Sequence, residues 1–587
     1  MSDFAHFGGV SDEEYAAIRK HNADVEANPD SFEHWEALIA ACEALEGGIN
    51  RNSSPAALET FRDAYDRFLH KFPLLFGYWS KYAEFEFSIA GPESAEMVYE
   101  RGVASVSNSV DLWLAYCNFK TETTHDPQLV RELFERGANA VGLDFMAHIF
   151  WDRYIDYEGL QEAHDRIFAL HARVVRIPLH QYARYYERFR ALAIERPLTE
   201  LASADIISRF RSEVESEYNA RGIGEQAGDA MEREIRTKVD AMFYEIFATT
   251  QGEVTKRWTY ESEIKRPYFH VTELDQQQLS NWQKYLDFEE QEGDFARITT
   301  LYERCLTTCA LYEEFWLRYA RWMSAQDEKE EDVRNIYRRA CTVFVPVSRP
   351  GIRLQWAYFE EAFDRVDVAL AIHEALLDKI PDCIEVITSW ANVARRQYGL
   401  EAAVQVYRDQ IDTPTVDLYT KAALVAEWAY MVWKTNRSAD EARAVFLKNA
   451  QWYADSRIFW DRWFQFELEQ PGDGDQEERV AHVFEDLRNK SRLPTSLKLE
   501  YTKLYLEFLV QRGSKDAMMT YLQVDREMFG PTSVSYASRS GTNAKENGAS
   551  RGELDELSTR KATAKSFAFY ELYEEPSSDA QIPTDFN

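Results

Sequence analysis

Residues 79–86 read Trp-Ser-Lys-Tyr-Ala-Glu-Phe-Glu, and versions of this phrase recur along the chain. A tryptophan opens each copy, at intervals of 32 to 40 residues on either side of one break: Trp79, Trp113, Trp151, Trp282, Trp316, Trp356, Trp390, Trp428 and Trp460. The aromatic and acidic positions that follow in the clearest copies are Tyr82, Phe85, Glu86, Tyr116, Tyr154, Glu158, Tyr285, Phe288, Glu289, Tyr319, Trp463, Phe466 and Glu467. A period in this range is typical of a solenoid, whose units bury their apolar faces by stacking on one another. We therefore expect these residues to pack between repeats.

A second apolar pattern follows each phrase and ends in an aromatic-acid-arginine triplet or a variant of it. Examples are Tyr99-Glu100-Arg101, Phe134-Glu135-Arg136 and Tyr302-Glu303-Arg304. Prolines such as Pro73 and Pro346 come after this second pattern, where a proline ends a helix. Each repeat is thus predicted to be a pair of antiparallel helices, and the fold class to be an all-α solenoid.

The glutamate of the phrase is expected to lie inside the repeat. Glu86 comes seven residues after Trp79, so the two share one face of a helix. A carboxylate on that face is partly desolvated and needs a hydrogen-bond donor. The tyrosine or arginine of the triplet is the candidate donor for Glu86, and likewise for Glu158, Glu289 and Glu467. The alternative is a solvated carboxylate at the edge of the buried face.

The composition favours a protein-binding role over nucleic-acid binding. The 587 residues are 45% hydrophobic and 14% aromatic, which suits a large helical core, and the net charge is −33. Broad binding to phosphate backbones relies on lysine and arginine, so basic protein tails are expected as partners and RNA contact as indirect or minor. No secretory signal and no run of 18 apolar residues is found, which predicts a soluble intracellular protein without a membrane segment.

The repeats are interrupted between Ile177 and about Arg266, where no clear aromatic phrase is found. Residues 531–566 are rich in Ser, Thr, Gly, Asn and Lys and are predicted to be disordered. The predicted organisation is an N-terminal extension (1–24), an N-terminal array (25–180), a helical linker (181–269), a C-terminal array (270–530), the disordered linker (531–566) and an aromatic tail segment (567–587) suited to docking.

One local feature runs against the overall charge. Five arginines with interleaved tyrosines lie close together at Arg173, Arg176, Arg184, Arg188 and Arg190. Arginine beside aromatic rings can hold phosphates and stack on bases, which makes this stretch a candidate basic contact surface. The alternative, favoured by the acidity of the chain, is that these arginines pair with acids of neighbouring repeats.

No motif for catalysis, cofactor binding or metal binding is present. The chain lacks the glycine-rich phosphate loops, the paired-histidine zinc motif and the serine nucleophile elbow. Its six cysteines are scattered, and Cys305 and Cys309 have no second pair of ligands, so buried hydrophobic roles are expected. We predict neither enzyme activity nor a cofactor.

The C-terminal array holds more aromatic side chains than one helical hairpin buries. Five of them are the candidate dimer interface: Trp428, Trp433, Trp452, Phe459 and Phe464. The alternative is that they fill the core of the array itself.

The Trp-x-x-Tyr-x-x-Phe-Glu phrase followed by an aromatic-Glu-Arg helix resembles the half-a-TPR (HAT) repeat of RNA-processing scaffolds. Two further stretches, Arg-Ile-Pro-Leu-His-Gln-Tyr at 176–182 and Ile-Lys-Arg-Pro-Tyr-Phe-His-Val at 264–271, resemble the pre-mRNA-processing factor 39 family. The resemblance implies two HAT arrays joined by a long helical linker, as in that family.

The same resemblance implies a nuclear, non-catalytic scaffold of the U1 small nuclear ribonucleoprotein (U1 snRNP), acting in pre-mRNA splicing when the 5′ splice site is recognised. It also implies dimerisation through the C-terminal array, with itself or a paralogous HAT protein, and binding of basic, arginine-rich tails of U1 proteins. The alternative function is a HAT scaffold of mRNA 3′-end cleavage and polyadenylation or of ribosomal RNA processing.

Overall fold

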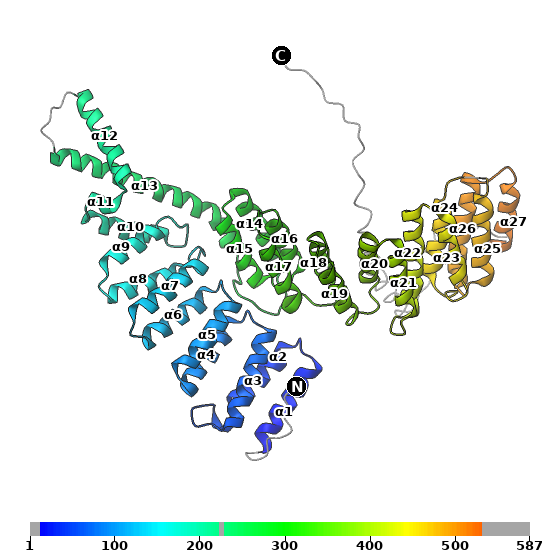
Figure 1. The fold of residues 1–587 in the computed structure, drawn as a ribbon, viewed down its shortest axis with the longest axis horizontal. Helices are drawn as coiled ribbons and strands as arrows, with labels where there is room; N and C mark the ends of the chain where they lie inside the picture. Colours follow the sequence, from blue (N-terminus) through cyan, green and yellow to red (C-terminus); the bar gives the residue numbers. More distant parts are fainter. Residues whose placement is uncertain (1–11, 222–227, 473, 531–587) are drawn as a thin grey trace, which may run out of the picture. The chain divides into compact units, whose positions relative to one another are not determined.

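The chain folds into two units, Met1–Ile372 and His373–Asn587. A computed structural model describes residues 12–221, 228–472 and 474–530, and every regular element among them is helical (Figure 1). The predicted disordered linker and aromatic tail, 531–566 and 567–587, lie outside the described residues. No described helix combines the length and the apolar character needed to cross a bilayer.

The first unit is built from helical hairpins. Its elements are α1 (Asp12–Ala27), α2 (Phe32–Glu43), the 3-10 turn η2 (Leu45–Gly47), α3 (Pro55–Lys71), α4 (Phe76–Ala90), α5 (Pro92–Ser105), α6 (Val110–Thr123), α7 (Pro127–Val141), α8 (His148–Leu160), α9 (His164–Val174), α10 (Tyr182–Ile194), α11 (Leu198–Leu201), α12 (Ala204–Arg221), α13 (Gly228–Glu261), α14 (Gln276–Glu292), α15 (Phe295–Thr308), α16 (Glu313–Ser324), α17 (Glu330–Arg339), the π turn η3 (Ala340–Phe344) and α18 (Gly351–Ala362). Helix α19 (Val366–Leu377) crosses the boundary between the units.

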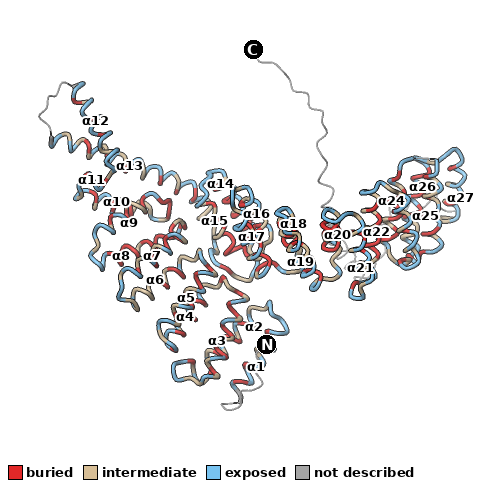
Figure 2. Tube along the Cα trace, in the orientation of Figure 1, coloured by how far each residue is buried: buried red, intermediate tan, exposed pale blue. Residues whose placement is uncertain are grey.

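The second unit continues the same pattern. Its helices are α20 (Ile384–Tyr398), α21 (Leu400–Asp412), α22 (Leu418–Asn436), α23 (Ala439–Asn449), α24 (Arg457–Glu469), α25 (Gln476–Lys490), α26 (Thr495–Arg512) and α27 (Ala517–Phe529). Many helices that follow one another in the sequence pack together, as α4 does on α5, α20 on α21 and α22 on α23. Buried positions run along the facing sides of these helices (Figure 2). The prediction of an all-α solenoid of helical hairpins is confirmed.

Local sequence explains where the helices begin and how closely they approach. Ser54, Ser109 and Asp126 cap α3, α6 and α7 by accepting hydrogen bonds from backbone N–H groups of the first turn. Gly137 of α7 faces the ring of Phe150, which a β-carbon would approach to 2.7 Å. The glycine therefore lets the second helix of one repeat pack directly on the first helix of the next.

The element boundaries differ in part from the predicted organisation. Helix α1 begins at Asp12, so a helix that packs on α2 occupies much of the predicted extension 1–24. Within the predicted linker 181–269, α10 packs on α9 and on α13, and the end of α13 packs on α14. The linker helices thus act as members of the stack, and the predicted C-terminal array 270–530 is divided between the two units. The packing of these linker helices in the stack could not be predicted from the repeat pattern, because the helices lack the tryptophan phrase.

Candidate functional site: the repeat interior and the joint between the arrays

In most of the N-terminal repeats and in some later ones, the tryptophan of the phrase holds the turn that precedes its own helix. In five repeats the indole Nε1 donates a hydrogen bond to the carbonyl six residues earlier, at 2.7 to 3.1 Å: Trp35 to Pro29, Trp79 to Pro73, Trp113 to Ser107, Trp316 to Ala310 and Trp460 to Ala454. Trp151 reaches Gly142 in the same way. A buried indole N–H needs an acceptor, so the bond fixes both the ring and the turn.

The second position of the phrase stacks on the aromatic residue of the preceding triplet. The ring pairs Tyr65–Tyr82, Tyr99–Tyr116, Phe134–Tyr154, Tyr260–Tyr285, Tyr302–Tyr319 and Phe446–Trp463 lie 4.5 to 5.8 Å apart, with interplanar angles of 23° or less. The rings at the third position, such as Phe85 and Phe288, are half-buried beside these stacks. The predicted packing residues therefore lie between repeats.

The glutamate of the phrase is buried and ion-paired, but its partner differs from the predicted one. The donor is an arginine three residues before the aromatic member of the triplet, on the preceding helix. The pairs and their shortest distances are Arg62–Glu86 (2.7 Å), Arg131–Glu158 (2.8 Å), Arg257–Glu289 (2.6 Å), Arg334–Glu360 (3.1 Å) and Arg443–Glu467 (2.5 Å). Four of these five arginines hold both carboxylate oxygens in separate hydrogen bonds, a geometry that lysine cannot reproduce. A fixed Arg-x-x-aromatic spacing was the signal that could have identified the donor.

The acid and arginine of the triplets form a second series of contacts that links consecutive repeats. Glu135 accepts a hydrogen bond from the Tyr154 hydroxyl of the next helix at 3.0 Å, and from Arg173 at 2.8 Å. Arg173 in turn lies over the ring of Trp151, 5.0 Å from its centroid. The same arrangement joins Asp66 to Arg101 over Trp79, Glu100 to Arg136 over Trp113 and Glu303 to Arg339 over Trp316. The charged triplets thus link consecutive repeats of the stack.

The pKa values of these groups reflect their hydrogen bonds and burial. The hydrogen bond from Arg136 lowers the pKa of Glu100. Burial is the main cause of the raised pKa of the Tyr116 hydroxyl, and its hydrogen bond to Glu100 adds to the effect. Both shifts keep the ion pair and the neutral phenol in place over the physiological range.

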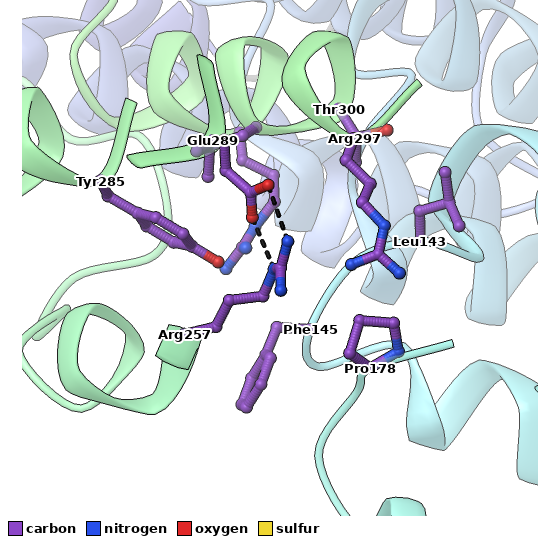
Figure 3. Close-up of a pocket in the computed structure, with 10 residues that line it drawn as sticks. Leu143, Phe145, Pro178, Arg257, Tyr285, Glu289, Arg297 and Thr300 are labelled. Atoms are coloured by element: carbon purple, nitrogen blue, oxygen red, sulfur yellow. Dashed lines mark hydrogen bonds and ion pairs between the residues drawn. The ribbon is translucent and has the colours of Figure 1, made fainter. Parts of the chain in front are cut away.

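A joint between the N-terminal repeats and α13–α15 is built around three arginines (Figure 3). Arg304 of α15 is largely buried and pairs with Asp144, in the turn after α7, and with Glu261, at the end of α13, at 2.8 and 2.7 Å. Arg257 holds Glu289 nearby, while the Arg297 side chain extends toward Leu143. Burial raises the pKa of Asp144, and burial together with the charge of Arg257 lowers the pKa of Arg297. The joint is therefore held by ion pairs whose charges are largely buried from water.

The two stretches that carry the family resemblance lie at or near this joint. Pro178 lines it beside Leu143, and the backbone N–H of His180 donates to the Phe145 carbonyl at 2.7 Å. The His180 ring stacks on Trp258 of α13, with centroids 6.1 Å apart. Downstream, Arg266 donates to the carbonyl of Thr272 at 3.0 Å and closes the loop before α14. Both stretches position helices, which is a structural role.

The structure divides the predicted basic contact surface into two groups. Arg173 and Arg184 are used within the fold, since they pair with Glu135 and Asp152 at 2.8 and 2.6 Å. Arg176, Arg188 and Arg190 are exposed, and none of them forms an ion pair with another described residue. The alternative of pairing with neighbouring acids therefore holds for Arg173 and Arg184.

The predicted dimer interface is corrected at two of its five residues. Phe459 and Phe464 are buried in the core of the second unit, where Phe459 packs on Phe446 and Phe464 on Tyr501. Trp428 and Trp433 are half-buried, and Trp452 is 69% exposed. Phe459 and Phe464 offer no surface to a partner because they face inward on α24, at positions that helical spacing alone did not separate from the outward ones.

The described residues show no arrangement typical of a catalytic centre. Among them, no group of three or more His, Cys, Asp or Glu side chains is placed to hold a metal ion. All six cysteines are free thiols, and burial raises the pKa of Cys42 and Cys341 to about 12, which keeps them protonated and unreactive.

The fold and the repeat interior together define an α-solenoid of HAT repeats. Sequence models described as the PRP39 N-terminal HAT repeat and the PRP39 C-terminal HAT repeat match residues 19–191 and 255–396. The chain belongs to the pre-mRNA-processing factor 39 family. It is 47% identical to pre-mRNA-processing factor 39 of Schizosaccharomyces pombe, over 90% of this chain and 89% of that protein. It is 31% identical to the protein of the same name from Homo sapiens, over 84% of this chain and 74% of the relative.

Two more distant similarities are also found. The U1 small nuclear ribonucleoprotein component PRP42 of Saccharomyces cerevisiae is 23% identical, over 54% of this chain and 58% of the relative. Among solved structures, the crystal structure of CSTF-77 is similar in fold, with a TM-score of 0.51 at 14% identity, covering 87% of this chain and 92% of the other.

Proposed function

We propose that the chain is a non-catalytic scaffold of the U1 snRNP that acts in pre-mRNA splicing, at recognition of the 5′ splice site. The 47% identity to pre-mRNA-processing factor 39 of S. pombe, over nine tenths of the chain, carries this proposal. The similarity to a relative named as a U1 component supports membership of the U1 snRNP, and the splicing role of the relatives supports a nuclear location.

The mechanism we propose is multivalent protein binding. A solenoid offers long surfaces between its repeats, and a net charge of −33 attracts basic segments. Arginine-rich tails of U1 proteins are therefore the proposed partners. RNA contact is indirect or minor in this mechanism, since two of the five arginines of the basic stretch are already paired with acids and the chain has a net charge of −33.

We also propose that the second unit mediates dimerisation, with a second copy or with a paralogous HAT protein. Trp452 is 69% exposed, and α27, the last helix of the described residues, exposes Met519 and Leu522, at 75% and 63%. Exposed apolar side chains of this kind favour coverage by a partner.

Light scattering on the full chain tests this dimer. We expect twice the monomer mass at micromolar concentration, and a shift to monomer in a Trp452→Glu, Met519→Glu variant. Leu160→Glu is the matched control, because Leu160 is a similarly exposed apolar residue in the first unit. If the wild-type chain is monomeric, pairing with a paralogous HAT protein is the remaining form of the proposal, and co-purification from cells tests it. Recovery of the chain from cells without a HAT partner would then contradict the proposal.

The scaffold function is tested by the RNA and proteins that accompany the tagged chain when it is purified from cells. We expect U1 RNA to dominate, and to be released together with U1 proteins at high salt. Enrichment of pre-ribosomal RNA, or of 3′-end cleavage factors without U1, would instead assign the chain to the alternative HAT scaffolds.

A further inference from the structure

The contact series between repeats is interrupted at α23 and α24. In several repeats the aromatic residue at the second position of the phrase donates to the acid of the preceding triplet, as Tyr154 does to Glu135. Here the corresponding residues are Trp463 and Leu447. The Trp463 ring keeps its stack on Phe446, at 5.8 Å and 2°. Its Nε1, however, is buried and donates to no described residue. Leaving a buried donor without an acceptor is unfavourable, so an acceptor from a ligand would be stabilised here.

Trp463 lines a groove of about 430 Å³ between α23, α24 and α25. Leu447, which is 47% exposed, and Val483 form its apolar wall, while Asp440 and Glu478 lie among its acidic residues. The volume falls within the range of sites that bind small ligands or single peptide segments. We call this the Trp463 groove.

The two arginines that line the Trp463 groove already lie beside acidic residues of the fold. Arg443 pairs with Glu467 at 2.5 Å and with Asp440 at 2.6 Å. Arg479 lies 3.7 Å from the same Glu467. Glu478 is exposed and forms no ion pair with another described residue. The groove therefore has a negative rim that favours a cationic ligand and disfavours phosphates.

A groove at the equivalent place in the first unit differs from the Trp463 groove in whether its aromatic donor has an acceptor. It measures about 350 Å³, lies beside Arg131 and Tyr154, and has Arg166 where the Trp463 groove has Arg479. There the aromatic donor is satisfied internally, because the Tyr154 hydroxyl reaches Glu135. The space between helices is thus a general feature of the repeats, while the unpartnered donor distinguishes the Trp463 groove from that one.

We propose that the Trp463 groove binds an extended, basic segment of a partner protein. A backbone carbonyl of the segment accepts from Trp463 Nε1, which can only donate. An apolar side chain packs on Leu447 and Val483, and a lysine or arginine pairs with Glu478 and Asp440. The inference rests on the proposed function only in taking basic protein tails as the partners, and it assigns them a site in the second unit.

The test uses the full chain and a fluorescein-labelled peptide of alternating arginine and leucine, with fluorescence anisotropy at about 150 mM salt, where surface charges are partly screened. Leu447→Gln places a neutral acceptor beside Trp463 and removes the apolar wall, so we expect about fivefold weaker binding. Glu478→Lys is expected to weaken binding about five- to tenfold. Glu485→Lys is the matched control, because it makes the same charge change on an exposed residue of α25 that does not line the groove; its affinity should stay within about twofold of wild type.

Three outcomes would overturn the proposal. One is an affinity unchanged by Leu447→Gln, and another is equal weakening by Glu478→Lys and Glu485→Lys, which would mean general attraction to an acidic chain. The third is tighter binding of a labelled single-stranded oligouridine than of the peptide. Melting temperatures of all variants serve as a check of folding. The peptide-binding result is independent of U1 RNA co-purification. Failure of the peptide test would leave the scaffold function standing, and failure of the co-purification test would leave the proposed binding by the Trp463 groove standing.

Discussion

Lys120 of α6 lies 2.5 Å from Glu96 of α5, so this repeat has the inter-repeat ion pair with its charges exchanged. In the flanking repeats the cation is on the earlier helix, as in Arg62–Glu86 and Arg131–Glu158. Coulomb attraction does not depend on which partner carries which sign, so the fold requires a compatible pair at two positions rather than particular residues. Between α9 and α10, Phe168 and Phe189 take the corresponding places with stacked rings 5.3 Å apart.

Exchanging both charges of the Glu96–Lys120 pair is expected to restore stability that a single charge change removes. Lys120→Glu alone places two carboxylates together and should lower the stability of the first unit by about 1 to 2 kcal/mol. Adding Glu96→Lys should recover most of this loss, and Glu100 remains as the acceptor for Tyr116 at 2.7 Å. Chemical denaturation of the wild type, the two single variants and the double variant measures the coupling, and strictly additive losses would contradict it.

Glu289 tests the buried pair with Arg257, both of whose side chains are 4% exposed. Glu289→Gln keeps a hydrogen-bond acceptor, so we expect a loss of about 1 to 2 kcal/mol. Glu289→Leu leaves a buried arginine short of its main partner and should cost about 3 to 5 kcal/mol. Thermal melting separates the two variants. The double variant Arg257→Met, Glu289→Leu is expected to melt above Glu289→Leu; equal melting temperatures of the Gln and Leu variants would contradict burial of the charge.

Arg304 is predicted to hold the joint closed. Arg304→Met leaves Asp144 and Glu261 buried without their cation, and we expect a loss of about 3 to 5 kcal/mol together with faster hydrogen exchange at residues 142–147. Arg101→Met, at an exposed ion pair with Asp66, is the control and should leave exchange at 142–147 unchanged. Unaltered exchange at these residues in Arg304→Met would show that the joint does not depend on this pair.

The buried His171 is expected to make the folded protein less stable in mild acid. Burial, helped by Arg188, lowers its pKa to about 4, against an ordinary value near 6.5. Between these values the unfolded chain binds a proton that the folded chain does not, so stability is complete above about pH 6.5 and falls as the pH drops toward 4, by about 3 kcal/mol in total. Other groups around the ring are Asp152, Arg184 and Tyr185.

The variant His171→Phe isolates this effect. Other repeats have Phe or Tyr at this place in the stack, as Phe134 does, so the substitution should fold. We expect its melting temperature to vary less between about pH 4 and 6.5 than that of wild type. His125→Phe, at an exposed position between α6 and α7, is the control and should follow the wild-type curve. A parallel pH dependence for wild type and His171→Phe would assign the acid sensitivity to other groups.

The amino-acid sequence was enough to predict the repeats and their inward faces. The periodicity of an α-helix is local, so Trp79, Tyr82 and Glu86 could be placed on one buried face, and the spacing of the tryptophans indicated the hairpin unit. The need of Glu86 for a donor also followed from burial alone. Family membership could be anticipated because two stretches, 176–182 and 264–271, are distinctive in composition and order.

Only the tertiary structure identified the partners across repeats. Arg62 rather than a triplet residue meets Glu86 because the offset between stacked helices determines which turns face each other, and that offset depends on side-chain packing. The pairing of Arg304 with Asp144 joins two helical repeats that are far apart in the sequence, which no local pattern encodes. The same holds for Phe459 and Trp452: both are aromatic and close in sequence, yet one fills the core and the other is exposed, because each is positioned by a different neighbouring helix. Local periodicity sets which face of a helix is apolar, while the contacts made by that face require the rest of the fold.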